Sequence, residues 1–158
     1  MNSEKVLSFF QEITKIPRES GHEEHIIAYL QKFAADRNLE CRTDEAGNVL
    51  IVKEAAPGHE NVPAIVLQSH SDMVCEKNEG VEHDFAKDPI KYVIEDGWMI
   101  APDTTLGADC GIGVRLSLHF WTVIFRLEKS SVCSQQLRRQ VLMVLWRFSQ
   151  GSLRVRCC

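Results

Sequence analysis

The stretch PAIVLQSHSDM, residues 63–73, decides how the rest of the chain is interpreted. Its apolar run Ala64–Leu67 follows a proline and ends in polar residues, a pattern typical of a buried strand. In open α/β sheets, ligands bind at the carboxyl ends of the strands. A strand over residues 64–69 would therefore bring the imidazole of His70 and the carboxylate of Asp72 to a position where chemistry is usually performed.

A second stretch, TTLGADCGIG at residues 104–113, offers the carboxylate of Asp109 in a glycine-rich turn before an apolar segment. Imidazole and carboxylate groups are both ligands that suit Zn²⁺. Each residue also has a structural interpretation: Asp109 could cap the start of a helix, and His70 and Asp72 could form a hydrogen-bonded pair. The residues taken singly leave both interpretations open.

The order of the expected elements favours an α/β fold over a helical bundle. Ser20 and Glu23 form an S-x-x-E pattern that predicts a capping box for the second helix, and His22 and His25 are expected to be exposed at its start. Residues 74–91 are expected to form a long polar loop. The expected elements are helices at 4–16 and about 22–36, strands at 39–43, 49–53 and 64–69, and a β-hairpin at 92–100 with an Asp-Gly turn.

Composition places the chain among globular proteins of one domain. Its 158 residues are 44% hydrophobic and 25% charged, and no stretch approaches the length of a membrane span. The start of the chain lacks the pattern of a signal peptide, and the six cysteines form no C-x-x-C pair. We therefore expect a cytoplasmic protein with reduced thiols that binds neither membrane nor nucleic acid.

The charge balance changes abruptly at Val114. Residues 1–114 contain 10 Lys and Arg against 21 Asp and Glu, a balance of −11, whereas residues 115–158 contain 8 against 1, a balance of +7. The basic residues also change from mainly lysine to mainly arginine, and only Gly151 remains of the glycines and prolines. Such a break indicates that the two parts of the chain differ in origin.

Four motifs in a fixed order suggest a family. HSDMV at 70–74, HDFAKDPI at 83–90, the hairpin and TTLGADCGIG together resemble the N-terminal part of the cytosolic aminoacyl-histidine (non-specific Xaa-His) dipeptidases. These belong to the aminoacylase-like clan of two-metal peptidases. PRESGHEEHIIAYL and DEAGNVLI, upstream, fit the same pattern. The resemblance implies that residues 1–114 are an incomplete N-terminal part of a three-layer α/β zinc-peptidase catalytic domain with a mixed sheet.

The resemblance also implies roles for individual residues. His70 would be a ligand of one zinc, and Asp109 would bridge the two zinc ions of the site. Asp72 would be the acidic residue of the catalytic site that lies behind the ligands and orients His70 or the catalytic water. Cys110 stands where the family commonly has Asn, and we interpret it as a tolerated neighbour. The substrate of the whole enzyme would be a dipeptide, and family members are often homodimeric.

After Val114 the resemblance ends. The family continues with a Thr-Thr-x-Glu-Glu type motif, whose first Glu is the general base and second a metal ligand, and with later ligands that are absent from residues 115–158. Reading the codons of residues 134–146 one base early permits Thr-Thr-Ala-Glu-Glu-Thr-Gly-Leu-Asp-Gly-Ala-Leu, with the Gly from Met143-Val144 forced by the genetic code. We therefore expect residues 115–158 to be a frame-shifted, non-native tail and the chain to be inactive.

Two alternatives remain. Residues 135–148 can be drawn as a basic amphipathic helix, which would make the chain a non-catalytic binding module for a membrane surface or nucleic acid. The other alternative is a one-metal hydrolase that uses Cys110 as a ligand.

Overall fold

The computed structural model describes residues 8, 10–54, 65–123 and 130–135, with the side chains placed for most of them. Residues 10–13 form a helical turn, and the remaining elements follow in an α/β order. None of the helices in these ranges is long and apolar enough to cross a membrane. The elements are α2 (Glu24–Ala35), β1 (Glu40–Thr43), β2 (Val49–Lys53), β3 (Ile65–His70), β4 (Val93–Glu95), β5 (Trp98–Ile100), α3 (Ala108–Val123) and β6 (Ser130–Gln135).

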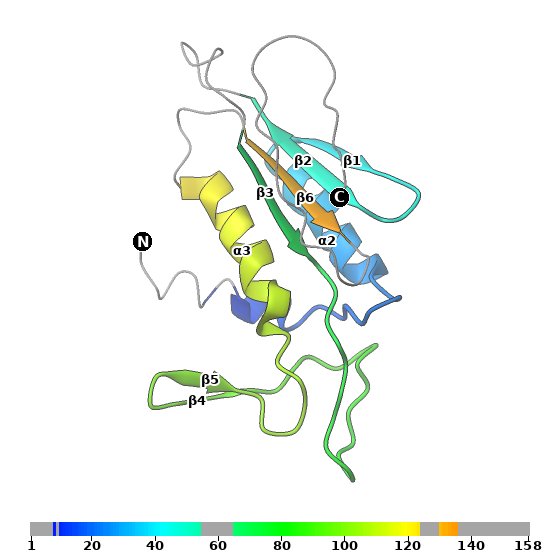
Figure 1. Ribbon diagram of the computed structural model, residues 1–158, viewed down its shortest axis with the longest axis vertical. Helices are drawn as coiled ribbons and strands as arrows, with labels where there is room; N and C mark the ends of the chain where they lie inside the picture. The colour runs from blue at the N-terminus through cyan, green and yellow to red at the C-terminus, as the bar shows by residue number, and fades with distance from the viewer. Residues whose placement is uncertain (1–7, 9, 55–64, 124–129, 136–158) are drawn as a thin grey trace.

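The main sheet is mixed, with the strand order β1-β2-β6-β3 (Figure 1). β1 pairs with β2 and β2 with β6 in antiparallel fashion, whereas β6 pairs with β3 in parallel, with His70 opposite Gln135. Among the described residues β3 is thus one of the two edge strands, with β1 at the other edge, and its carboxyl end carries His70. The expected α/β class and mixed sheet are confirmed.

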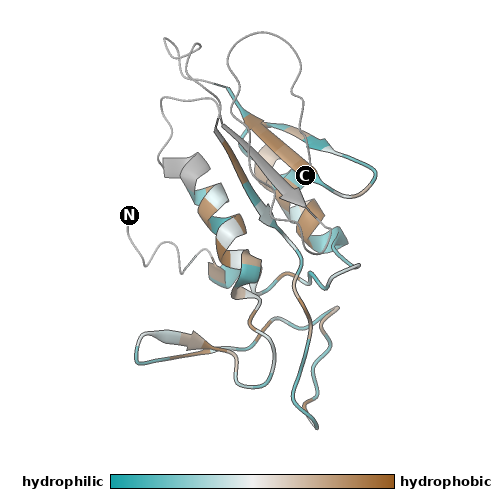
Figure 2. Cartoon of the chain, in the orientation of Figure 1, coloured by the Kyte–Doolittle hydropathy of each residue, from teal (hydrophilic) through white to brown (hydrophobic). Residues whose placement is uncertain are grey.

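One hydrophobic cluster joins the two helices to the sheet. α2 packs against β1 and β2, and α3 packs against β3 and β6, and both helices bury apolar side chains in one cluster with residues of β2 (Figure 2). Burial of such side chains is the main driving force for folding. The cluster is built from Ile13, Leu30, Phe33, Ala34, Val49, Ile51, Val114 and Leu118.

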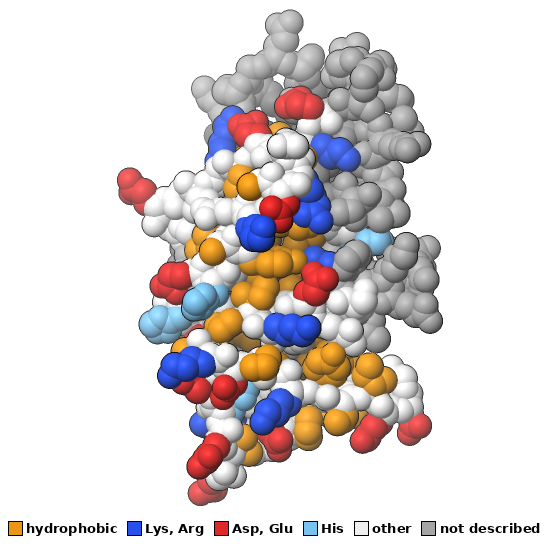
Figure 3. Space-filling model, turned by 180° about the vertical axis from the view of Figure 1, so that it is seen from behind, with side chains coloured by type: hydrophobic (Ala, Val, Ile, Leu, Met, Phe, Trp, Pro, Cys, Tyr) orange, Lys and Arg blue, Asp and Glu red, His pale blue; other side chains and the backbone are white. Residues whose placement is uncertain are grey.

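The hairpin of β4 and β5 lies apart from this sheet, and its turn is the one that the sequence predicts. Asp96 and Gly97 both have positive φ, 50° and 81°, as a tight two-residue hairpin turn requires. The hairpin exposes several apolar side chains, among them Trp98, which is 73% exposed. They contribute to the hydrophobic side chains at the lower right of Figure 3.

The start of α2 differs from the prediction. The helix begins at Glu24 with Glu23 as its N-cap, and no side chain caps it, so the predicted Ser20–Glu23 capping box is wrong. The Ser20 hydroxyl is used elsewhere, because it donates to the Asp72 carboxylate, and Glu23 Oε1 accepts instead from the Gly21 amide at 2.7 Å. His25, and His22 just before the helix, are exposed as expected.

Two described elements contain residues that follow Val114. α3 continues through that position to Val123, and β6 lies between β2 and β3 in the sheet. The predicted helix at 135–148 falls outside the described residues except for Gln135, which ends β6. The origin of residues 115–158 in a shifted reading frame stays a prediction about the gene.

Candidate metal centre

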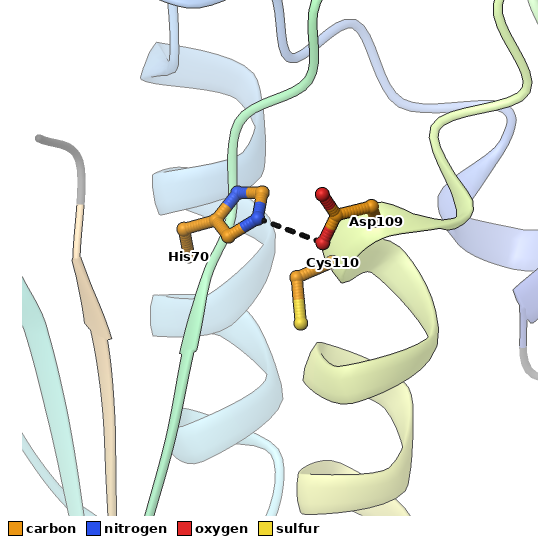
Figure 4. Close-up of side chains that lie close together, drawn as sticks. All are labelled: His70, Asp109 and Cys110. Carbon is orange, nitrogen blue, oxygen red and sulfur yellow. Dashed lines mark hydrogen bonds and ion pairs between the residues drawn. The ribbon is translucent and has the colours of Figure 1, made fainter. Parts of the chain in front are cut away.

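His70 stands at the end of β3 with each ring nitrogen facing a carboxylate. Its Nδ1 lies 3.0 Å from Asp72 Oδ1 and 3.2 Å from the Asp72 carbonyl oxygen. Its Nε2 lies 3.2 Å from Asp109 Oδ1 (Figure 4). The structure therefore brings together the three residues that the sequence selects, from two segments far apart in the chain.

The three side chains differ in their access to solvent. Only 10% of the Asp72 side chain is exposed to solvent, compared with 38% of the His70 side chain and 97% of the Asp109 side chain. Asp109 precedes the regular part of α3, because its φ and ψ of −92° and 113° are not helical. Its carboxylate turns toward His70 from this position (Figure 4). The centre thus has an open side at Asp109 and a buried side at Asp72.

Asp72 is fixed by a residue that the sequence analysis assigned to a helix cap. Ser20 Oγ donates a hydrogen bond to Asp72 Oδ2 at 2.6 Å, while Oδ1 of the same carboxylate faces His70. Both oxygens of Asp72 are therefore occupied, which sets the direction of its carboxylate. The sequence held no local signal for this contact, since the two residues are separated by 52 positions.

Arg18 is the second residue that the sequence analysis missed. Its side chain is almost completely buried, with 1% of the residue exposed. Nη1 donates to the carbonyls of Ser71 and Asp72 at 3.3 and 3.2 Å, and Nη2 donates to the carbonyl of Gly107 at 2.5 Å. Burial lowers the pKa of Arg18 to about 10, so its guanidinium remains charged at neutral pH.

Cys110 lies beside the centre. Its sulfur, His70 and Asp109 offer potential ligand atoms that all lie within 4.8 Å of one another. The sulfur points away from the Asp109 carboxylate in Figure 4 and packs where a Cβ on Gly113 would overlap it. Burial raises the pKa of the Cys110 thiol, which disfavours the thiolate that would bind a metal or attack a substrate. These observations favour Cys110 as a packed neighbour over a one-metal hydrolase built on it.

The long loop after β3 is fastened to the turn that carries Asp109. The Thr105 amide donates to the Glu76 carbonyl at 2.9 Å, and the Asn78 amide donates to the Asp103 carbonyl at 2.9 Å. In the same loop, the rings of His83 and Phe85 meet edge to face, with their centroids 4.5 Å apart. The loop thereby supports the position of the second ligand-bearing segment.

The donor set fits a zinc ion. One imidazole nitrogen and one carboxylate oxygen, 3.2 Å apart and accessible to solvent, are ligand types that Zn²⁺ prefers. A carboxylate behind the other ring nitrogen, as Asp72 is here, is the usual support for a metal-binding histidine. Within the part of the chain that the structure describes, His70 and Asp109, with the sulfur of Cys110 beside them, are the residues that could hold a metal.

Comparison with known proteins agrees with these motifs, although no family model matches the chain. Over 118 residues, 75% of the chain, it is 42% identical to the cytosol non-specific dipeptidase of Escherichia coli strain K12 and spans 24% of that protein. It covers 29% of the crystal structure of aminoacylhistidine dipeptidase from Vibrio alginolyticus, with 88% of the chain aligned, 37% identity and a TM-score of 0.78.

More distant structures share the fold alone. They include a tripeptidase from Staphylococcus aureus, with 23% identity and a TM-score of 0.67 over 85% of this chain and 36% of that one. The chain thus spans about a quarter of the length of the Escherichia coli dipeptidase, the curated relative that it matches. By sequence and by fold, it is a relative of the cytosolic aminoacyl-histidine dipeptidases.

Proposed function

We propose that this chain carries the first metal ligands of a two-zinc dipeptidase. In this proposal His70 and Asp109 bind zinc, with Asp109 as the bridge, and Asp72 orients His70. The observation that carries it is the line of contacts Asp72–His70–Asp109, in which the imidazole has a buried carboxylate on one nitrogen and an exposed carboxylate on the other. The whole enzyme would act on dipeptides in the cytoplasm, as a homodimer.

The residues present account for binding and orientation. Asp72 would hold the His70 ring with Nε2 directed outward, and Asp109 would present its exposed carboxylate at the same point. Zinc, when bound, would polarise the scissile carbonyl and lower the pKa of a bound water. According to the resemblance, the general base and the further ligands belong to a Glu-Glu motif and to later segments, and residues 115–158 do not contain that motif. We therefore propose that the 158-residue chain binds zinc weakly and does not hydrolyse dipeptides.

We further propose that residues 115–158 come from a shifted reading frame. The helix α3 supports this, because after Val114 it buries Arg115, Ser117 and His119, which are each at most 5% exposed. Charged and polar residues are rarely buried to this degree. Val114 and Leu118 supply the apolar residues of this helix, but a helix selected for such burial would be expected to carry apolar residues at the other buried positions too.

The proposed metal centre is tested by titrating the purified chain with Co²⁺, a spectroscopic substitute for Zn²⁺, and following the visible absorption. The wild-type chain should bind cobalt weakly, and His70→Ala and Asp109→Ala should each abolish binding. His22→Ala, a change at an exposed histidine outside the centre, should leave binding unchanged. Equal binding by wild type and His70→Ala would refute the assignment of the ligands.

A further inference from the structure

The segment Arg18–Ser20 touches both ligand-bearing parts of the candidate metal centre without contributing a ligand. We propose that this segment, called the brace below, is a positioning element that sets the geometry of the centre. Arg18 would join the two ligand-bearing segments, and Ser20 would fix the carboxylate behind His70. The inference rests on the proposed metal-binding function and adds two residues to it.

Arg18 connects segments that are remote in sequence. Its guanidinium donates to the carbonyls of Ser71 and Asp72, which follow β3, and to the carbonyl of Gly107, which precedes Asp109. A guanidinium can do this because it presents several donors in one rigid plane, whereas a lysine presents a single compact ammonium group. One buried side chain thus ties together the two segments that carry His70 and Asp109.

The backbone of the brace is also locked to the end of the strand. The Met73 amide donates to the Arg18 carbonyl at 2.9 Å, and the Ser20 amide donates to the Met73 carbonyl at 3.2 Å. These two bonds place the Ser20 hydroxyl beside Asp72, where it donates at 2.6 Å. A chain of contacts therefore runs from Ser20 through Asp72 to His70.

The guanidinium of Arg18 packs closely against two glycines. A Cβ on Gly107 would overlap Arg18 Nη2, and a Cβ on Gly111 would lie 2.8 Å from the same atom and 2.8 Å from Phe10. Both glycines flank the Asp109 turn. The turn and the arginine are therefore fitted to one another, as a positioning role requires.

The test uses the full chain and a Co²⁺ titration. Partners that support a metal-binding histidine typically change metal affinity 10- to 100-fold when removed. Ser20→Ala and Arg18→Lys should weaken cobalt binding by about 10-fold or more and alter the visible spectrum, and Ser20→Thr should restore much of the affinity. Wild-type affinity in both Ser20→Ala and Arg18→Lys would overturn the proposal.

Matched controls separate this effect from a general loss of stability. Arg115→Lys changes another buried arginine, which donates to the Tyr29 hydroxyl at 2.8 Å and pairs with Glu12. Thr14→Val removes another buried hydroxyl, which donates to the Gln11 carbonyl. Both should lower the stability to urea without changing the cobalt spectrum. Ser20→Ala keeps the test decisive if Arg18→Lys does not fold.

A second readout needs no metal. Long-range ¹H–¹⁵N NMR of the neutral His70 ring should show the proton on Nδ1, facing Asp72, in the wild-type chain. Ser20→Ala should give a mixture of the two tautomers. If the wild type binds no cobalt but its His70 tautomers differ from those of Ser20→Ala, the proposed metal function fails and the positioning role of the brace is supported. If the tautomers are the same in both chains, the brace is overturned whether or not cobalt binds.

Discussion

At the scale of single residues, a few buried polar groups fix the positions of exposed ones. Asp109 is almost fully exposed, and His70 is partly exposed, yet their positions follow from the buried Asp72 and Arg18. The sequence indicated the three residues of the candidate centre because each follows a predictable strand or precedes an apolar segment, and the resemblance to dipeptidases supplied their expected roles. It did not reveal Arg18 or Ser20 as partners, since their contacts are made across 52 to 89 positions of the chain.

Gly107 offers a sharp test of the packing around Arg18. Its φ of 68° disfavours any other residue, and a Cβ there would overlap Arg18 and Met73. Gly80 has a similar φ of 81° but nothing within 4 Å of a Cβ. Gly80→Ala should cost about 1–3 kcal/mol in the free energy of unfolding, from backbone strain alone. Gly107→Ala should cost clearly more, measured by urea denaturation, and equal costs would contradict the close fit.

Cys75 provides a prediction that depends on pH. Burial raises the pKa of its thiol from 9.0 to about 11. At pH 8 only about one thiol in a thousand would be ionised, so alkylation by iodoacetamide should be much slower than for a free cysteine. Mass spectrometry of the modified peptide measures this, and a rate equal to that of free cysteine would contradict the burial of the thiol.

The same pKa shift has a consequence for stability. The folded state keeps the Cys75 proton over the range in which the unfolded state loses it, so its contribution is complete below pH 9.0 and is lost as the pH rises toward about 11. The wild-type chain should lose stability to urea over this range. Cys75→Ala should lose less, and identical slopes for the two chains would refute this contribution.

At the scale of elements, the pattern of apolar residues along the chain predicted the amphipathic helix and the strands with apolar residues. It did not predict the strand whose sequence is mostly polar. The helix α2, the strands β1 to β3 and the hairpin were all expected within one or two residues of their bounds. The strand β6 was not, because Ser-Ser-Val-Cys-Ser-Gln has no apolar run or alternation that would signal a strand. The start of α2 was misjudged because the local S-x-x-E pattern takes no account of Asp72, which binds the serine.

The helix α2 should contribute strongly to the stability of the fold. Leu30 is 1% exposed and belongs to the cluster that joins both helices to β2. Leu30→Ala should reduce the free energy of unfolding by about 2–5 kcal/mol, through lost burial and a cavity. His25→Ala, on the exposed face of the same helix, should change it by less than about 0.5 kcal/mol. Similar losses in both variants would contradict the assigned faces.

At the scale of the whole molecule, the chain joins an acidic part that carries the dipeptidase-like motifs to a basic part that lacks them. The first part places the two proposed metal ligands at the end of β3 and the start of α3, which are joined by contacts between these elements and by Arg18. The sequence could predict this half of a site because its motifs are local. It could not predict how residues after Val114 would fold, since their composition departs from that pattern.

The purified chain should hydrolyse no dipeptide, with or without added zinc. The reason is that a zinc site with two protein ligands and no general base lacks the groups that hold the metal and activate water. Release of free amino acids from Xaa-His dipeptides measures this directly. A zinc-dependent rate that disappears in His70→Ala would show that the chain is catalytically complete.

The most direct test of the central claim is to sequence the gene again, from codon 105 to several hundred bases beyond codon 158. The account predicts that a one-base correction near Val114 opens a long frame that encodes the Glu-Glu motif and the later metal ligands. A confirmed frame, with no such motifs in any frame downstream, would contradict it. The basic tail would then be genuine, and a binding module derived from a dipeptidase would become the better explanation.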